Sequence, residues 1–201
     1  MEPPVKSSPA LPLYVDLDGT LFPGDSLHES VLLLLRRNPL NLFRLLGWLL
    51  QGKLAFKRRV ADEALPDAST LPYHASFLDF LRAERASGRR LVLASAADHR
   101  IGHDVAQHLG LFEDHIGSTD VNLSGARKLS AIQQHSNGPF AYAGNAAVDL
   151  EVWRGSAEAV AVNAPAEVSR RLKELHPQAR IFERPSMSLR TLLKAIRLTQ
   201  W

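Results

Sequence analysis

Apolar runs that end in polar turns alternate along this chain with segments of helical spacing. The apolar runs predict strands, and the segments with apolar residues every three to four positions predict helices. We predict strands within residues 13–21, 89–98, 114–118, 140–149, 157–163 and 180–182, and helices at about 27–37, 40–50, 53–64, 73–86, 99–109, 126–134 and 166–175. Such alternation is typical of a parallel sheet with helices on both faces. The pattern therefore predicts an α/β fold with a doubly wound parallel sheet.

Residues 23–72 interrupt the alternation with helical segments alone, which predicts a helical insertion whose first helix Ser26 caps. Its most hydrophobic part, residues 31–50, lacks the roughly 20 continuous apolar residues of a membrane span. The interruptions are Arg36, Arg37, Asn38, Pro39, Asn41 and Arg44. Two interpretations remain for this apolar, arginine-containing segment: ordinary packing, or an interfacial surface that contacts lipid.

The composition is that of a globular protein, with 45% hydrophobic and 22% charged residues. The net charge of +3 is too small to argue for nucleic-acid binding, and it suits anionic substrates or a negatively charged membrane surface. Without cysteine the chain has neither disulfides nor thiolate metal sites. Residues 1–10 are rich in Pro and Ser, which predicts a disordered leader rather than a secretory signal. We expect a cytoplasmic protein, with a peripheral position at the inner face of the membrane as an alternative.

Two carboxylates follow the first predicted strand: Asp16 and Asp18 flank Leu17, and Gly19 comes next. In open α/β sheets, ligands bind beyond the carboxyl ends of the strands. Asp and Gly are also common in solvated turns. The longer string Asp-Leu-Asp-Gly-Thr-Leu at 16–21 is more specific than a turn requires, and it predicts a site.

This string resembles the first motif of the haloacid dehalogenase-like (HAD) phosphohydrolase superfamily, and the chain is similar to its phosphoserine phosphatase-like members with a C1 cap. The resemblance implies a Rossmann-like core of residues 11–22 and 73–187 and a helical cap of residues 23–72. It implies that Asp16 is the nucleophile and that Asp18 is the general acid and base, with both as ligands of Mg²⁺. An aspartate can accept a phosphoryl group, and Mg²⁺ prefers hard oxygen ligands.

The family's second and third motifs have counterparts in this chain. Ser95, near the end of the strand at 89–98, and the amide of Ala96 would hold phosphate oxygens. Alternatively, Ser95 caps the following helix. Lys128 lies near a predicted helix start, where a cation opposes the helix dipole, so neutralising the acidic cluster would explain it. Arg127 is the alternative candidate for that role.

The fourth motif, Gly-Asp-x-x-x-Asp, has a counterpart that departs from the family pattern. Gly144 and Asp149 match it, but Asn145 replaces the first aspartate. The resemblance implies that Asn145 and Asp149 complete the magnesium site. An amide oxygen can coordinate a hard cation, but the site has one negative charge fewer, so we expect weaker binding of Mg²⁺.

The end of the chain, residues 188–201, is basic and predicts an amphipathic helix that either packs on the sheet or contacts a membrane. With the cap, it resembles a subgroup in which a HAD domain precedes a UbiA-type prenyltransferase. The resemblance implies a Mg²⁺-dependent phosphomonoester phosphohydrolase acting on a phosphorylated small molecule or a prenyl- or lipid-linked sugar phosphate. Two alternatives remain: a phosphotransferase, and a catalytically weak domain that docks on or regulates a membrane prenyltransferase.

Overall fold

Six parallel strands form one sheet in the order β3-β2-β1-β4-β5-β6. The computed structural model describes residues 10–119 and 121–183. The strands are β1 (Leu13–Val15), β2 (Leu91–Asp98), β3 (Asp114–Ser118), β4 (Ala141–Gly144), β5 (Glu158–Val162) and β6 (Arg180–Phe182). From β1 the chain first builds one half of the sheet, through β2 and β3, and then the other half, through β4, β5 and β6. This confirms the predicted doubly wound, Rossmann-like α/β fold.

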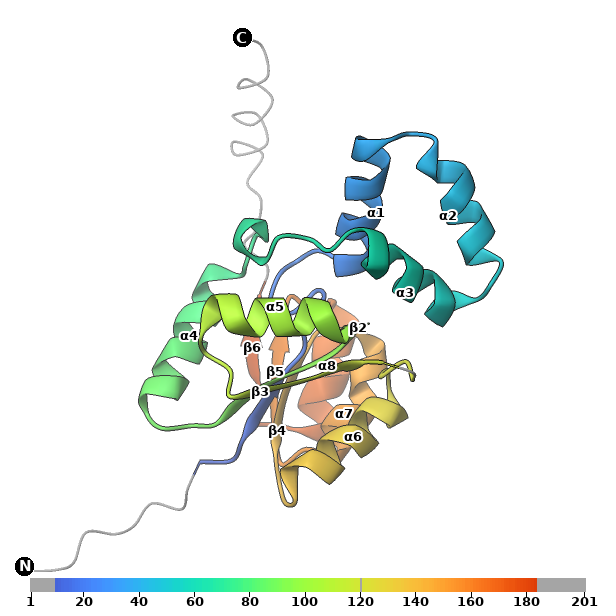
Figure 1. The fold of residues 1–201 in the computed structure, drawn as a ribbon. Helices are drawn as coiled ribbons and strands as arrows, with labels where there is room; N and C mark the ends of the chain where they lie inside the picture. The colour runs from blue at the N-terminus through green and yellow to red at the C-terminus, as the bar shows by residue number, and fades with distance from the viewer. Residues whose placement is uncertain (1–9, 120, 184–201) are drawn as a thin grey trace, which may run out of the picture.

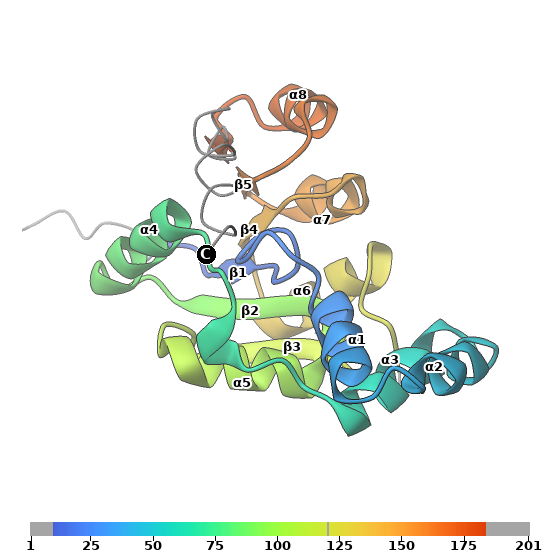
Figure 2. The ribbon, with the colours of Figure 1, turned by 90° about the horizontal axis from the view of Figure 1, so that it is seen from above.

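Helices cover both faces of the sheet (Figures 1 and 2). Helices α4 (Ala75–Ala86) and α5 (His99–Leu109) pack on one face. The opposite face carries α6 (Ala126–Ser136), α7 (Leu150–Gly155) and α8 (Ala166–Leu175), and the short helix η2 (Ala147–Asp149) leads into α7. The sheet is therefore buried on both sides, as parallel sheets generally are.

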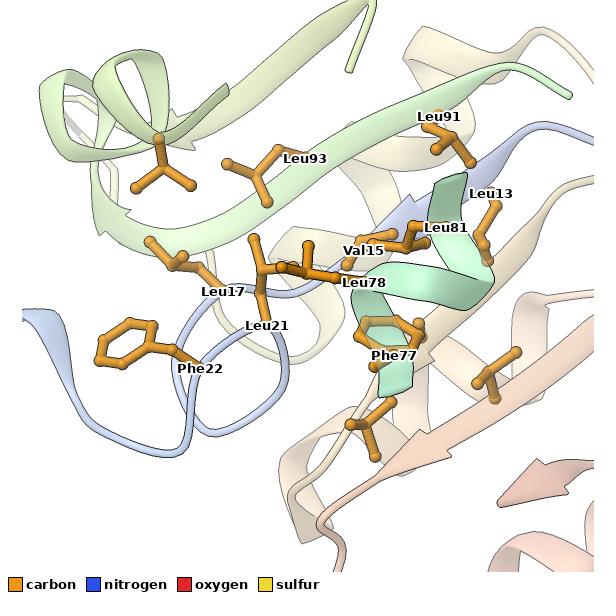
Figure 3. Packing of buried hydrophobic residues seen from close by; sticks show 14 of the residues in the cluster. Leu13, Val15, Leu17, Leu21, Phe22, Phe77, Leu78, Leu81, Leu91 and Leu93 are labelled. Carbon is orange, nitrogen blue, oxygen red and sulfur yellow. The ribbon is translucent and has the colours of Figure 1, made fainter. Parts of the chain in front are cut away.

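Alternation along the strands assigns each side chain to one of the two faces. On β1, Leu13 and Val15 join the core with α4 and α5, while Tyr14 joins the core with α6, α7 and α8. On β2, Leu91 and Leu93 lie in the first core (Figure 3). These runs are apolar throughout because both faces are covered, which explains why they appear in the sequence as short continuous apolar stretches.

The predicted cap segment 23–72 contains three helices, α1 (Ser26–Arg37), α2 (Asn41–Leu49) and α3 (Lys53–Glu63), and the short helix η1 (Ala68–Thr70). The three longer helices share a hydrophobic cluster of their own, separate from the two cores of the sheet. Its fully buried members are Leu34, Leu45, Val60 and Ala64. In Figure 1, α1, α2 and α3 form a group beside one end of the sheet.

One expectation for the cap helices is wrong. Asp25, not Ser26, caps α1: its Oδ1 accepts hydrogen bonds from the amides of Leu27 and His28 at 2.9 and 3.1 Å. Ser26 is the first helical residue, and its side chain is buried and contacts Asp18 instead. Asp and Ser are both favourable at this position, so the local sequence left the choice to tertiary contacts.

No helix within residues 10–119 and 121–183 combines the length and apolar character needed to cross a bilayer. The predicted leader at 1–10, except for Ala10, and the predicted amphipathic helix at 188–201 lie outside the described residues.

Candidate active site

The candidate site lies where the two halves of the sheet meet. β1 and β4 are neighbours at the centre of the sheet, and the following connections leave in opposite directions. Asp16 follows β1 directly, and its amide donates to the carbonyl of Ala143 on β4 at 2.9 Å. The residues after β4, Asn145 and Asp149, therefore end beside the residues after β1. Ligands bind at such a switch point in open α/β sheets.

Leu17 explains how two adjacent carboxylates are held at this edge. Its side chain is fully buried in the core between Asp16 and Asp18. Leu21 and Phe22, from the same loop, are buried in that core as well (Figure 3). Burial of each such side chain contributes about 2 kcal/mol to the free energy of unfolding, and this anchors the acidic loop to the core.

Lys128 lies at the centre of the buried charges. Its Nζ donates to Oδ1 of Asp16 at 2.7 Å and to the hydroxyl oxygen of Tyr142 at 3.0 Å, and it lies 3.7 Å from Oδ1 of Asp149. Burial lowers the pKa of Lys128, but Asp16 and Asp149 outweigh this effect and raise it. Lys128 is therefore charged, which supports the predicted neutralising role. Arg127, the alternative, is exposed.

Asp16 is unusual for a carboxyl group because it is almost completely buried. Burial raises its pKa to about 7, and the opposing attraction of Lys128 reduces but does not cancel this shift. Asp149 and Asp18 add repulsion. Oδ2 of Asp16 has no hydrogen-bond partner within the described residues, so this oxygen is available to a ligand.

Asp18 is held by α1. Its Oδ1 accepts a hydrogen bond from the Ser26 amide at 2.8 Å, and its Oδ2 accepts one from the Ser26 hydroxyl at 3.2 Å. Burial raises the pKa of Asp18, against the lowering effect of these bonds. An amide can only donate, whereas a hydroxyl can also accept. A proton on Asp18 is therefore accommodated at Oδ2, beside the Ser26 hydroxyl.

Asp149 is predicted as a metal ligand, and the structure places it in a dense set of hydrogen bonds. Its Oδ1 accepts from the Tyr142 hydroxyl at 2.7 Å, and its Oδ2 accepts from the amides of Asn145 and Ala146, both at 3.0 Å. Gly144 lies against the same carboxylate, since a Cβ there would come within 2.8 Å of Oδ2. In this arrangement Asp149 fixes the loop after β4 and orients Lys128.

Asn145, the residue that departs from the family pattern, lies against the acidic loop. A Cβ on Gly19, whose φ is +76°, would stand only 2.0 Å from its Nδ2. The Asn145 side chain is partly exposed and has no hydrogen-bond partner within the described residues. It lines the same cavity as Asp16 and Asp18, a space of about 470 Å³.

Ser95 and Ala96 lie at the neighbouring strand end. The Oγ of Ser95 is buried and accepts a hydrogen bond from the Ala97 amide at 3.0 Å. Asp98, not Ser95, caps α5, because its carboxylate accepts the amide of Arg100. The capping alternative for Ser95 is therefore wrong. Ala96 lines the cavity with Asp16, and the role of both residues in holding phosphate stays a prediction.

Sequence reasoning missed two residues of this site. Tyr142 joins Lys128 to Asp149, and Lys57 reaches from α3 toward the end of β2. The Nζ of Lys57 donates to the carbonyl of Ala96 and to Oδ1 of Asn122, both at 2.9 Å. Burial and the neighbouring Lys53 lower the pKa of Lys57. A tyrosine within the apolar strand β4 was a usable signal, because a buried hydroxyl needs a partner; one lysine in a basic helix gave none.

The sequence profile of the haloacid dehalogenase-like hydrolases matches residues 13–154, from β1 to α7. The chain belongs to this family. This confirms the prediction of a HAD-like hydrolase core, and the fold is shared with a phosphoserine phosphohydrolase-like protein.

Known relatives and structures agree with this assignment. A protein of Sinorhizobium fredii (strain NBRC 101917 / NGR234), named uncharacterized protein y4nM, is 35% identical over 95% of this chain. The chain spans only 37% of the length of that relative. A protein of unknown function from Bordetella pertussis Tohama I superposes with a TM-score of 0.61 at 13% identity, covering 88% of this chain and 99% of the other.

A second structure carries a functional description. It is a phosphoserine phosphohydrolase-like protein from Francisella tularensis subsp. tularensis SCHU S4, with a TM-score of 0.58 at 14% identity. The match covers 93% of this chain and all of the other. At this identity the likeness shows the fold.

The donor set at this site suits a hard divalent cation only in part. Within the described residues, no three histidine, aspartate or glutamate side chains are grouped as a metal site requires. The carboxylate of Asp149 is fully engaged, while Oδ2 of Asp16 and the side-chain amide oxygen of Asn145 are free of protein partners in the described part of the chain. Both are hard oxygen donors of the kind that Mg²⁺ accepts. Together with the Asp18 carbonyl, which the family resemblance implies as a ligand, these atoms would make a site with few protein ligands.

Proposed function

We propose that this HAD-like hydrolase is a Mg²⁺-dependent phosphomonoester phosphohydrolase that works through an aspartyl-phosphate. The observation that carries the proposal is the buried ion pair between Asp16, which lines the cavity, and Lys128, with the second oxygen of Asp16 left without a hydrogen-bond partner in the described part of the chain. A carboxylate held by a cation at the switch point of the sheet is placed to attack, and the cation to neutralise phosphate charge.

In the first step, Oδ2 of Asp16 attacks phosphorus and the bond between phosphorus and the ester oxygen breaks. The departing oxygen takes the proton that Asp18 holds at Oδ2, so an alcohol leaves. The raised pKa of Asp18 suits this role, since burial shifts this carboxyl group toward the protonated form, which acts as the acid. Ser26 holds Asp18 in position during the transfer.

In the second step, the ionised Asp18 accepts a proton from water, and the resulting hydroxide attacks phosphorus. The bond between phosphorus and Asp16 breaks, inorganic phosphate leaves, and both aspartates return to their first state. Lys128 stabilises negative charge on Asp16 and on the phosphoryl oxygens in both steps. Ser95 and the Ala96 amide are proposed to hold the remaining phosphoryl oxygens.

Magnesium would be held by Asp16, the Asp18 carbonyl and Asn145, with Asp149 fixing the loop that carries Asn145. When bound, it supplies a Lewis acid and a template for the phosphoryl group. A site with few protein ligands is consistent with Mg²⁺, which usually keeps several waters and shares substrate phosphate oxygens. We expect weaker binding than in a site with aspartate at position 145.

The substrate class follows from the cap. Lys57 and Lys53 line a small space of about 110 Å³ beside Asp18, together with Asp25, Asp98 and apolar cap residues. We propose that the leaving group carries a further polar part that these charged side chains contact. A prenyl- or lipid-linked sugar phosphate and a soluble phosphorylated metabolite both meet this requirement.

A substrate comparison tests the proposal and separates the two classes. Phosphate release would be measured with Mg²⁺ for p-nitrophenyl phosphate, phosphoserine and a polyprenyl-linked sugar phosphate, with the wild type and Asn145→Asp. We expect Mg²⁺-dependent release and a lower Mg²⁺ requirement in Asn145→Asp. Release only from water-soluble esters would rule out the lipid-linked class. No release from any substrate by either chain would contradict the proposed function.

A second candidate is a catalytically weak domain that docks on or regulates a membrane prenyltransferase. Two observations favour it: Asn145 removes a charge from the motif, and the relative from Sinorhizobium fredii is far longer than this chain. Under this candidate the wild type releases no phosphate, and Asn145→Asp restores release. Calorimetric binding of Mg²⁺ to the wild type at millimolar concentration would count against it.

A further inference from the structure

Helix α2 presents an apolar face to solvent. Five large apolar side chains on α2 and directly after it are 49–90% exposed, and Leu40 before the helix is exposed as well. The set is Leu40, Leu42, Phe43, Leu46, Leu49 and Leu50. Only Leu45 of this helix is fully buried, while Trp48 packs partly against the cap cluster. The solvent-exposed surface of α2 is therefore more apolar than that of a typical surface helix in a soluble domain.

The exposed positions repeat at helical spacing, so they form one surface rather than scattered contacts. Phe43, Leu46 and Leu50 follow at intervals of three and four, as do Leu42, Leu46 and Leu49. Of the other exposed large apolar residues, Leu32 lies on the neighbouring cap helix α1, whereas Leu175 on α8 is far along the chain from this set. We call the six side chains at 40–50 the α2 face.

The α2 face is remote from the chemistry. In both views α2 lies at the outer edge of the cap, with the sheet on the other side of α1 and α3 (Figures 1 and 2). The cap side chains described above at the sheet end, Ser26 of α1 and Lys57 of α3, belong to the other two cap helices. Neither the cavity at Asp16 nor the smaller space at Asp18 is lined by residues of the α2 face. Substrate binding therefore does not explain it.

The charges around the α2 face are mainly positive. Residues 31–63 contain seven Lys or Arg and two acidic residues, Asp62 and Glu63, of which Glu63 pairs with Arg44 of α2 at 2.6 Å, although the whole chain carries only +3. Arg36 on α1 and Arg59 on α3 are among the exposed members. An apolar face with a basic surround is complementary to a surface that offers hydrocarbon beneath anionic groups.

We propose that the α2 face docks on an anionic lipid bilayer, with α2 lying in the plane of the interface. The apolar side chains enter the boundary between head groups and acyl chains, and exposed basic residues beside them, Arg36 and Arg59, contact anionic head groups. Long arginine side chains reach from a buried stem to the head-group level. This docking is independent of hydrolysis, and it brings the cap against the membrane.

Vesicle co-sedimentation of the purified 201-residue chain tests the proposal without substrate. The probes are phosphatidylcholine vesicles with and without phosphatidylglycerol. We expect binding to the anionic vesicles, little binding to the neutral ones, and a fall with added salt, because salt screens the basic residues. Leu46→Ser should weaken binding about tenfold, from the lost apolar contact. Arg36→Gln and Arg59→Gln should each weaken it about fivefold.

Leu175→Ser is the matched control, since it makes the same change at a similarly exposed leucine on α8. We expect it to bind vesicles as the wild type does. The proposal is overturned if anionic vesicles do not bind the wild type, or if Leu46→Ser binds them equally well, which would place the contact elsewhere on the chain. It is also overturned if the wild type forms a dimer at higher concentration that Leu46→Ser does not, because a second copy then covers the α2 face.

Discussion

The Nζ of Lys128 lies 2.7 Å from Oδ1 of Asp16, although the two residues are 112 positions apart in the chain. The contact forms because β1 and the start of α6 meet at the same edge of the sheet. It places a buried cation on one oxygen of the carboxylate and leaves the other oxygen of this cavity-lining residue without a hydrogen-bond partner among the described residues. The account of catalysis above depends on this pair.

Replacing Lys128 with Met removes the cation and leaves Asp16 and Asp149 facing one another in a buried site. We expect kcat to fall by about 10²–10³-fold, since a charge that stabilises the phosphoryl oxygens is lost. The free energy of unfolding should fall by about 3 kcal/mol, because a buried charge loses its partner. Lys173→Met, at an exposed position of α8, is the control. It should change neither kcat nor the free energy of unfolding measured by chemical denaturation. Wild-type activity in Lys128→Met would refute its role.

Tyr142→Phe removes a hydroxyl that donates to Asp149 and accepts from Lys128. The ring still fills its place in the core, so we expect a folded chain that is about 1–3 kcal/mol less stable. We also expect kcat to fall about tenfold, because Lys128 is held less firmly toward Asp16. Tyr73→Phe is the control: its hydroxyl donates to the Ala68 carbonyl far from the site. If both variants lose stability and neither loses activity, Tyr142 is structural only.

Gly19→Ala should disturb the site far more than Gly88→Ala. Both glycines have positive φ, +76° and +87°, so alanine strains the backbone of each by about 1–2 kcal/mol. A Cβ at Gly88 meets no atom within 4 Å, whereas at Gly19 it would collide with Asn145. We expect Gly88→Ala to keep its activity and Gly19→Ala to lose both activity and affinity for Mg²⁺. Equal kinetics in the two variants would show that contact between Gly19 and Asn145 is unimportant.

The raised pKa of Asp16 predicts how stability and metal binding change with pH. Below the ordinary aspartate pKa of about 3.9, Asp16 is protonated in both the folded and the unfolded chain. Between that value and about 7, the folded chain holds the proton that the unfolded chain has lost, so the stabilising contribution of this group is lost as the pH rises through about 7. A cation bound by the ionised carboxylate offsets this loss.

We therefore expect Mg²⁺ to raise the melting temperature more at about pH 7.5 than at about pH 5, where protons compete for Asp16. Thermal denaturation with and without Mg²⁺ at the two pH values measures this. In Asp16→Asn, Mg²⁺ should shift the melting temperature only slightly and by the same amount at both pH values. A wild-type shift that does not increase with pH would mean that Asp16 does not hold the metal.

The order of strands and helices could be predicted from the sequence because each element carries its own signal. The apolar runs of β1 and β4 and the helical spacing of α4 and α5 are local patterns. The motif at 16–21 also had a local basis, since Leu17 alternates with two carboxylates and ends in the core. These local patterns can be recognised in the sequence without knowing which elements pack against them.

Contacts between distant elements could not be predicted in the same way. The choice of Asp25 over Ser26 as a cap depends on Asp18, which takes the Ser26 amide and hydroxyl. Lys57 looks like any lysine of a basic helix until α3 packs beside the end of β2. The bonds that occupy Asp149 come from Tyr142 and from the backbone of its own loop, and motif spacing alone does not reveal them.

The most direct test of the catalytic account compares initial rates of Mg²⁺-dependent phosphate release from p-nitrophenyl phosphate by the wild type, Asp16→Asn and Asp79→Asn. Asp79 is an exposed aspartate on α4 that pairs with Arg82, so its variant makes the same chemical change away from the site. The account predicts release by the wild type and by Asp79→Asn, and only background release by Asp16→Asn. Release by Asp16→Asn at the wild-type rate would contradict the assignment of Asp16 as the nucleophile.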